Sequence, residues 1–154
     1  MNDSGPLRSF RHKNFRIYYI STTLSNTGTW VQRIAQNWLV LELTNNAVWL
    51  GVVVALQSAP SLFSFFGGTL ADRISKPTLL ACTSFSGFFW AGALGLLVIT
   101  HHIQLWHVLV IAFGLGVTSA VDGPVRHSFL PELVPDEDIP NSVALNSVNF
   151  NTAR

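Results

Sequence analysis

Two long stretches without charge constrain this chain more than any other feature. Residues 43–71 and 77–121 contain no Asp, Glu, Lys or Arg. A soluble domain carries about 25% charged residues, whereas 11% of this 154-residue chain is charged and 49% is hydrophobic. One membrane-crossing helix needs roughly 20 apolar residues. The first stretch therefore fits one crossing, and the second fits two, divided by a polar break at residues 101–104.

This pattern predicts an all-α integral membrane fold. Residues 1–14 are expected to be cytoplasmic, and residues 15–127 to form four transmembrane helices. The predicted helices span about 15–42, 47–72, 77–100 and 104–127. Residues 128–140, with three prolines and four acidic residues, predict a cytoplasmic connection. Residues 141–154 predict the start of a fifth transmembrane helix, truncated at the end of the chain. Pro60 is expected to bend the second helix.

The distribution of basic residues predicts the orientation. They precede the first apolar segment, lie between the second and third apolar segments, and follow the fourth. They are Arg8, Arg11, Lys13, Arg16, Arg73, Lys76 and Arg126. Basic residues accumulate on cytoplasmic loops. All four crossings thus agree with a multi-pass protein of the cell membrane whose N-terminus is cytoplasmic. The net charge of +1 favours no polyanionic partner, so membrane lipid is an expected partner and nucleic acid is not.

A polar stripe runs along the first predicted helix. Its members follow a 4-3-4-3 spacing, which places them on one helical face; they are Thr22, Asn26, Thr29, Arg33 and Gln36. Roughly opposite lie the apolar residues Leu24, Val31, Ile34, Trp38 and Leu41. Turning the stripe to lipid is costly, about 2.5–3.5 kcal/mol for an arginine at the bilayer centre. The stripe is therefore expected to face a wet cavity or a partner helix.

Two interpretations of the polar stripe follow. In the functional one, the five residues line the pathway of a small-molecule substrate, and Arg33 contacts an anionic or carbonyl group. In the structural one, Arg33 extends toward the outer surface, while Asn26 and Gln36 only bond to neighbouring helices. The five polar positions exceed what helix association needs, which favours the pathway.

Small residues recur every fourth position in the second and third predicted helices. They are Gly51, Ala55, Ala59, Gly87, Ala91 and Gly95. This spacing lets membrane helices approach closely, so these residues are interpreted as packing positions. The single cysteine, Cys82, excludes an internal disulfide.

A charged patch, GGTLADRISKP at residues 67–77, interrupts the apolar chain. Gly68 stands one turn before Asp72 and allows a close helix contact there. Arg73 and Lys76 follow within reach of the carboxylate. Such a cluster predicts a cytoplasmic latch that ties helix ends together by charge-assisted bonds and releases them when the geometry changes. The alternative is that the two basic residues only keep the loop inside the cell.

The same patch resembles the signature loop between helices two and three of the major facilitator superfamily, G-x-x-x-D-R-x-G-R/K-R/K. Gly68, Asp72, Arg73 and Lys76 match it, and Ser75 and Pro77 depart from it. Residues 122–154 are similar to the exporter branch of enterobactin exporters, macrolide efflux proteins and transmembrane secretion effectors. WVQRIAQNWLVLELT in the first helix is similar to the same branch. The resemblance covers nearly the whole chain.

The resemblance implies a secondary transporter that exports small amphiphilic compounds, such as drugs or siderophores, in exchange for protons. Such a transporter has twelve crossings in two six-helix halves, with the substrate bound between the halves. The remaining transporter helices are then partners of this chain. In the family, the signature loop cooperates with an acidic residue on the fourth helix, and Asp122 matches it. Asp122 and Arg126 also share a helical face at i and i+4, so Asp122 is expected either to pair with Arg126 or to carry the coupling proton.

Other functional classes find less support. The Gly/Ala positions also suit a small non-transporting four-helix membrane module that dimerises. His101, His102 and His107 lack a carboxylate or cysteine companion for a metal site. The sequence shows no nucleotide-binding loop, nucleophile triad or zinc pattern. No enzyme activity, cofactor or metal is therefore predicted.

Overall fold

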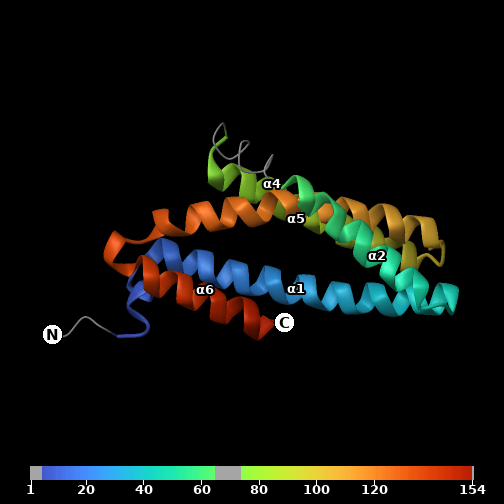
Figure 1. The fold of residues 1–154 in the computed structure, drawn as a ribbon, viewed down its shortest axis with the longest axis horizontal. Helices are drawn as coiled ribbons and strands as arrows, with labels where there is room; N and C mark the ends of the chain where they lie inside the picture. The colour runs from blue at the N-terminus through green and yellow to red at the C-terminus, as the bar shows by residue number, and fades with distance from the viewer. Residues whose placement is uncertain (1–4, 65–73, 154) are drawn as a thin grey trace. The chain divides into compact units, whose positions relative to one another are not determined.

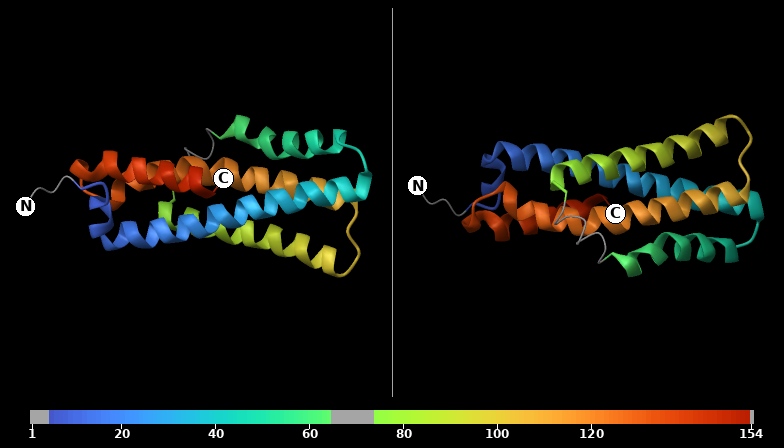
Figure 2. Two further views of the ribbon diagram at one scale, coloured as in Figure 1. Left: turned by 90° about the horizontal axis from the view of Figure 1, so that it is seen from below. Right: turned by 90° about the horizontal axis from the view of Figure 1, so that it is seen from above.

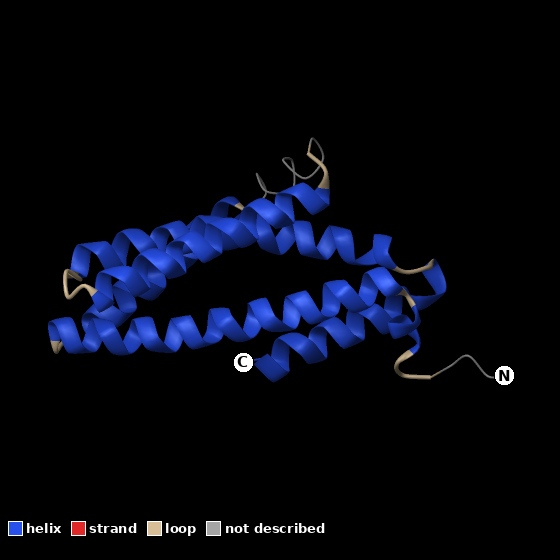
Figure 3. Cartoon of the chain, turned by 180° about the vertical axis from the view of Figure 1, so that it is seen from behind, coloured by secondary structure: helices blue, strands red, loops and turns tan. Residues whose placement is uncertain are grey.

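The computed structural model describes residues 5–64 and 74–153, with the exception of the Phe63 side chain. Within these ranges every regular element is helical and no strand occurs (Figure 3). The predicted all-α class is confirmed. Gly68, Asp72 and Arg73 of the charged patch lie outside the described residues.

Five α-helices form the described part of the chain (Figure 1). They are α1 Lys13–Thr44, α2 Val48–Ser58, α4 Lys76–Ile99, α5 Leu105–Phe129 and α6 Ile139–Ala153. Short 3-10 helices accompany them: η1 Arg8–Arg11, η2 Ala59–Phe63, η3 Leu130–Leu133 and η4 Asp136–Asp138.

Proline explains where α2 ends. The α-helix stops at Ser58, and the chain continues as η2, with Pro60 in its first turn. A proline lacks the N–H that an α-helix would use four residues back, and its ring crowds the preceding turn. The predicted bend at Pro60 is thus a change from α-helix to 3-10 helix. In the 128–140 connection, two 3-10 turns precede α6.

Two helical segments among the described residues are long and apolar enough to cross a membrane. They are α4, of 24 residues, and Leu105–Leu133, of 29 residues, which joins α5 and η3. The segment Val48–Leu62 is apolar but shorter. Helix α1 is 32 residues long, but its polar stripe lowers its hydropathy. The count of four crossings remains a prediction.

The chain divides into two compact units, and α1 contributes to both. The first unit comprises the described residues up to Val31 and those from His127 onward, and the second comprises Gln32–Arg126. In the first unit, η1 and the early part of α1 meet α6. The rings of Trp30 and Phe150 lie 6.4 Å apart between α1 and α6.

The second unit packs the late part of α1 with α2, α4 and α5 (Figure 2). Its apolar core consists of Val40, Val53, Leu94, Val108, Ile111 and Ala112. Helices α4 and α5 lie against each other, because the Ser86 and Thr118 hydroxyls are 2.8 Å apart. Leu94 of α4 and Val108, Ile111 and Ala112 of α5 belong to the same apolar core.

Glycines of α5, rather than those predicted from spacing, mark the close approaches. A Cβ at Gly114 would lie 2.4 Å from the Trp90 ring of α4, and one at Gly116 would lie 2.5 Å from the Gln57 carbonyl oxygen of α2. A Cβ at Gly51, Gly87 or Gly95 would meet nothing within 4 Å among the described residues. Fourfold spacing identifies a helical face but not which face meets a neighbour, so the described residues show no packing contact at these three glycines.

Large apolar side chains are exposed on helices of both units. Leu24 and Trp38 of α1 are 75% and 72% exposed, and Phe88 of α4 is 75% exposed. A protein dissolved in water would leave these surfaces unfavourably hydrated. Lipid, or further helices in lipid, is the solvent that such surfaces fit.

Candidate functional site

The structure turns most of the polar stripe of α1 away from the exposed apolar face. Thr22 is 2% exposed and Gln36 is fully buried. Asn26 and Arg33 are half-buried, and Thr29 is exposed. The Thr29 hydroxyl donates to the Ser25 carbonyl oxygen at 2.9 Å within the helix. The sequence-predicted face is therefore buried at its two ends and half-open between them.

Gln36 has a partner that the sequence pattern missed. The Gln57 Nε2 of α2 donates to the Gln36 Oε1 at 3.3 Å. The Gln36 Nε2 and the Gln32 Nε2 are buried without a hydrogen-bond partner in the described part of the chain. Gln57 escaped prediction because it is an isolated polar residue in an apolar helix.

A second set of inward polar residues lies on α6. Ser142 is fully buried, Asn146 is half-buried and Asn149 is 3% exposed. The Ser142 hydroxyl donates to the Ile139 carbonyl oxygen at 2.8 Å. Neither amide atom of Asn149 has a partner among the described residues. The 4-3 spacing of these residues is the same signal that reveals the stripe of α1, so this face of α6 is predictable from spacing alone.

The carboxylate of Asp122 bridges α4 and α5. One oxygen accepts a hydrogen bond from the Thr83 hydroxyl at 2.6 Å, and the other pairs with the Arg126 Nε at 2.5 Å. The structure thus brings together Asp122 and Arg126 of the predicted latch. Lys76 begins α4, and the other latch residues, Gly68, Asp72 and Arg73, lie outside the described residues. The ion pair is the arrangement seen here.

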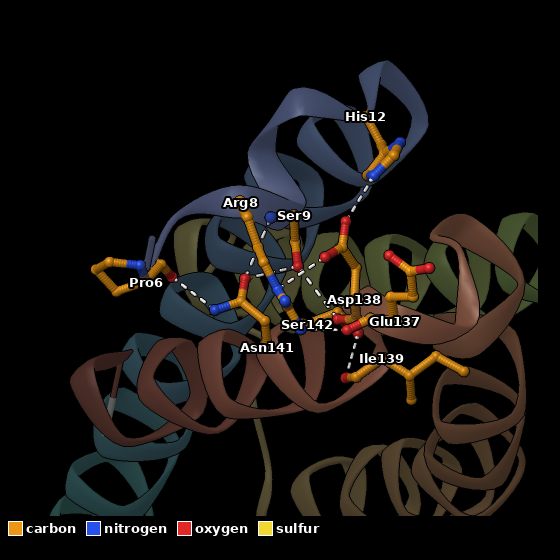
Figure 4. Close-up of polar contacts among 9 residues, drawn as sticks. All are labelled: Pro6, Arg8, Ser9, His12, Glu137, Asp138, Ile139, Asn141 and Ser142. Atoms are coloured by element: carbon orange, nitrogen blue, oxygen red, sulfur yellow. Dashed lines mark hydrogen bonds and ion pairs between the residues drawn. The ribbon is translucent and has the colours of Figure 1, made fainter. Parts of the chain in front are cut away.

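A polar cluster, named here the N-terminal clasp, joins the segment before α1 to the start of α6 (Figure 4). Asp138 pairs with the Arg8 Nε at 2.7 Å and lies 2.9 Å from the His12 Nε2. The Arg8 guanidinium also donates to the Glu137 carbonyl oxygen. Asn141 accepts from the Ser9 hydroxyl at 2.7 Å and donates to the Pro6 carbonyl oxygen at 2.8 Å.

The N-terminal clasp gives roles to residues that sequence reasoning assigned otherwise. Asp138 belongs to the acidic residues that predict a cytoplasmic connection, and Arg8 to the basic residues that predict the orientation. Their separation of 130 positions along the chain hides the contact from any local pattern. The clasp fastens the N-terminal segment to the connection between α5 and α6.

Asp138→Asn is expected to loosen residues 6–12 without unfolding the helices. The substitution removes the charge that holds both Arg8 and His12, and a charge-assisted bond is about twice as strong as a neutral one. Amide hydrogen exchange should rise about tenfold in residues 6–12. The exposed neighbour Asp136, changed to Asn, is the matched control. Equal exchange in the two variants would contradict a holding role for Asp138.

Three or more clustered metal-ligating side chains are not found in the described ranges. His101 has a backbone φ of 57° in the turn after α4, and the His102 Nδ1 lies 2.6 Å from the Thr100 carbonyl oxygen. These histidines shape the turn between α4 and α5.

Comparison with known proteins identifies the family. The sequence profile of the transmembrane secretion effector family matches residues 4–154. The staphyloferrin A transporter of Staphylococcus aureus (strain NCTC 8325 / PS 47) is 31% identical over 141 residues, which cover 90% of this chain and 36% of that protein. The chain thus spans about a third of the length of this curated relative. No solved structure matches. The chain belongs to the transmembrane secretion effectors of the major facilitator superfamily, a family of membrane transport proteins and not of enzymes.

Proposed function

We propose that the chain forms the first helices of a proton-coupled secondary transporter that exports small amphiphilic compounds, such as drugs or siderophores. Family membership supports a transport role. The relative named for staphyloferrin A supports a siderophore among the substrates. In this proposal the N-terminal residues 1–14 are cytoplasmic, and residues 15–127 cross the cell membrane as four helices. A cytoplasmic connection follows at 128–140, and a fifth transmembrane helix begins in 141–154.

One observation carries the proposal: α1 buries polar side chains of its stripe while it exposes large apolar side chains on the opposite face. Its polar Thr22 and Gln36 are buried, whereas its apolar Leu24, Ile34 and Trp38 are exposed. A helix in lipid turns polar groups toward protein or toward a water-filled path. This arrangement suits a helix that borders a solute pathway.

The proposal gives two groups of residues a role. The polar stripe Thr22, Asn26, Thr29, Arg33 and Gln36 lines the substrate pathway. The cytoplasmic latch consists of Gly68, Asp72, Arg73, Lys76, Asp122 and Arg126. The remaining transporter helices complete the pathway, and protons are the coupling ions.

Arg33→Ala and Asp72→Asn in the full-length transporter test these roles. Proton-gradient-dependent efflux of a dye or of staphyloferrin A is measured from vesicles at equal protein content. The Arg33 variant loses a contact to the solute, and the Asp72 variant loses the charge of the latch, so each is expected to reduce efflux at least tenfold. Thr27→Ala, an exposed position of α1 outside the stripe, is the control. Unchanged efflux in both variants would remove the assigned roles, and no efflux from the wild type would contradict the transporter itself.

A second function is favoured by the glycines that face open space. Gly51, Gly87 and Gly95 leave room for a close neighbour, as a dimerising non-transporting four-helix membrane module requires. Stable oligomers without solute flux in the full-length protein would support the module over the exporter.

A further inference from the structure

The apolar core of the second unit ends in a layer of polar side chains. Val40 of α1 and Val53 of α2 are fully buried in that core. One helical turn away on each helix stand Gln36 and Gln57, and these two side chains meet across the helices. The side-chain chemistry therefore changes from aliphatic to amide at one level of both helices.

Helix α5 changes character at the same level. Its Ala112 belongs to the core, and Gly116 stands one turn further on. The Gln57 carbonyl oxygen occupies the space that a Cβ of Gly116 would need, at 2.5 Å. The backbones of α2 and α5 are thus in direct contact at Gln57 and Gly116. This contact fixes the position of the Gln57 backbone, from which its side chain extends.

The amides of this layer have unused hydrogen-bonding groups. Gln57 uses one N–H on the Gln36 Oε1. The Gln36 Nε2 and the Gln32 Nε2, one turn apart on α1, are both buried and without a partner in the described part of the chain. A buried N–H without an acceptor is costly, and a native structure retains it where something else supplies the acceptor.

We propose that Gln32, Gln36 and Gln57, the glutamine layer, form a subsite that binds hydroxyl or carboxylate oxygens of the transported solute. The inference rests on the proposed transport function and adds Gln32 and Gln57 to the predicted stripe. The unused groups are N–H donors, so they require oxygen acceptors. Gln36 is fully buried, whereas Gln32 and Gln57 are partly exposed residues. Neutral amides bind a hydroxyl or a carboxylate without a permanent counter-charge, as a site that must release its ligand requires.

Methionine substitutions separate solute binding from a purely structural role. Methionine retains the length of glutamine and removes its hydrogen bonds. The full-length transporter with Gln36→Met, and separately with Gln57→Met, is compared with Gln104→Met, a change at an exposed glutamine between α4 and α5. Two quantities are measured: KM for staphyloferrin A efflux, and Tm in the absence of solute.

The glutamine layer predicts a large effect on KM and a small effect on Tm. KM should rise about tenfold in Gln36→Met and in Gln57→Met, the loss of one to two hydrogen bonds to the solute. Tm of Gln36→Met should change little, because the variant loses the hydrogen bond from Gln57 but also removes a buried donor that has no acceptor in the empty protein. Gln104→Met should leave both quantities unchanged. Gln57 is partly exposed, so its variant tests the subsite even if Gln36→Met fails to fold.

Two outcomes would overturn the subsite. Unchanged KM in both variants, with wild-type efflux intact, removes the glutamine layer as a solute contact and leaves the transport function standing. The same unchanged KM with a lower Tm for Gln36→Met assigns the amides to a bound water or to packing. If the wild type does not export staphyloferrin A, the siderophore proposal fails by itself, and the KM comparison is made with the exported dye.

Discussion

Gly116→Ala is expected to destabilise the second unit by about 2 kcal/mol. This value is the free-energy cost of overpacking minus the gain in helix propensity from glycine to alanine. The added Cβ would stand 2.5 Å from the Gln57 carbonyl oxygen. This obstacle is backbone of a helix, so it yields only if α2 and α5 move apart. Thermal unfolding of the purified protein in detergent should show Tm lowered by about 5 °C.

Gly92→Ala is the matched control for this substitution. It lies in α4 of the same unit, and a Cβ there meets nothing within 4 Å among the described residues. The helix-propensity gain is the same at both positions, so Tm of this variant should be unchanged or slightly raised. Equal Tm values for the two variants would mean that the close approach of α2 and α5 does not exist in the protein.

Asp122→Leu is expected to cost about 2 kcal/mol of stability and most of the transport activity. The substitution deprives Arg126 and Thr83 of the carboxylate that both contact. The Asp122 and Arg126 side chains are 24% and 20% exposed, so the cost lies below the 3–5 kcal/mol typical of a fully buried pair broken at one side. Thermal unfolding and efflux of the full-length transporter measure the two losses.

A double-mutant cycle isolates the ion pair. Asp122→Leu with Arg126→Leu removes both charges at once, so this variant should be more stable than Asp122→Leu alone. The coupling between the two positions should be about 1–2 kcal/mol. Strictly additive losses would show that the two side chains do not interact. A double variant that recovers stability but not efflux would assign the pair to transport.

Composition and charge spacing predict the helical class, because long stretches without charge indicate a lipid environment. In lipid, a helix satisfies the hydrogen bonds of its own backbone. Residues 77–121 are free of charge, and α4 and α5, with the turn between them, occupy this stretch. The end of α2 at Ser58 follows from the chemistry of Pro60. The packing glycines could not be chosen, because Gly116 and Gly87 look alike until a neighbouring helix is placed.

The candidate site was predictable only where its residues repeat along one helix. The 4-3-4-3 spacing of α1 reveals a polar face, and Thr22 and Gln36 of that face are buried. The contact of Gln36 with Gln57 and the N-terminal clasp join residues on different elements. Such contacts depend on how helices are placed side by side, which periodicity does not encode. The polar residues Ser142, Asn146 and Asn149 of α6 also repeat along one helix, so spacing predicts that face as well.

The most direct test of the account is the solvent around the two faces of α1 in a bilayer. With Cys82 changed to Ser, single cysteines at Leu24, Ile34 and Trp38 on one face, and at Asn26 and Gln36 on the other, carry spin labels in the full-length transporter. Lipid-soluble oxygen should relax the labels at Leu24, Ile34 and Trp38 strongly, and a water-soluble nickel chelate should not. Labels at Asn26 and Gln36 should show low oxygen exposure, and the chelate should be more effective at Asn26 than at Trp38. High chelate exposure at Trp38, with oxygen favouring Gln36, would contradict the central claim that α1 turns its apolar face to lipid and its polar stripe toward a solute path.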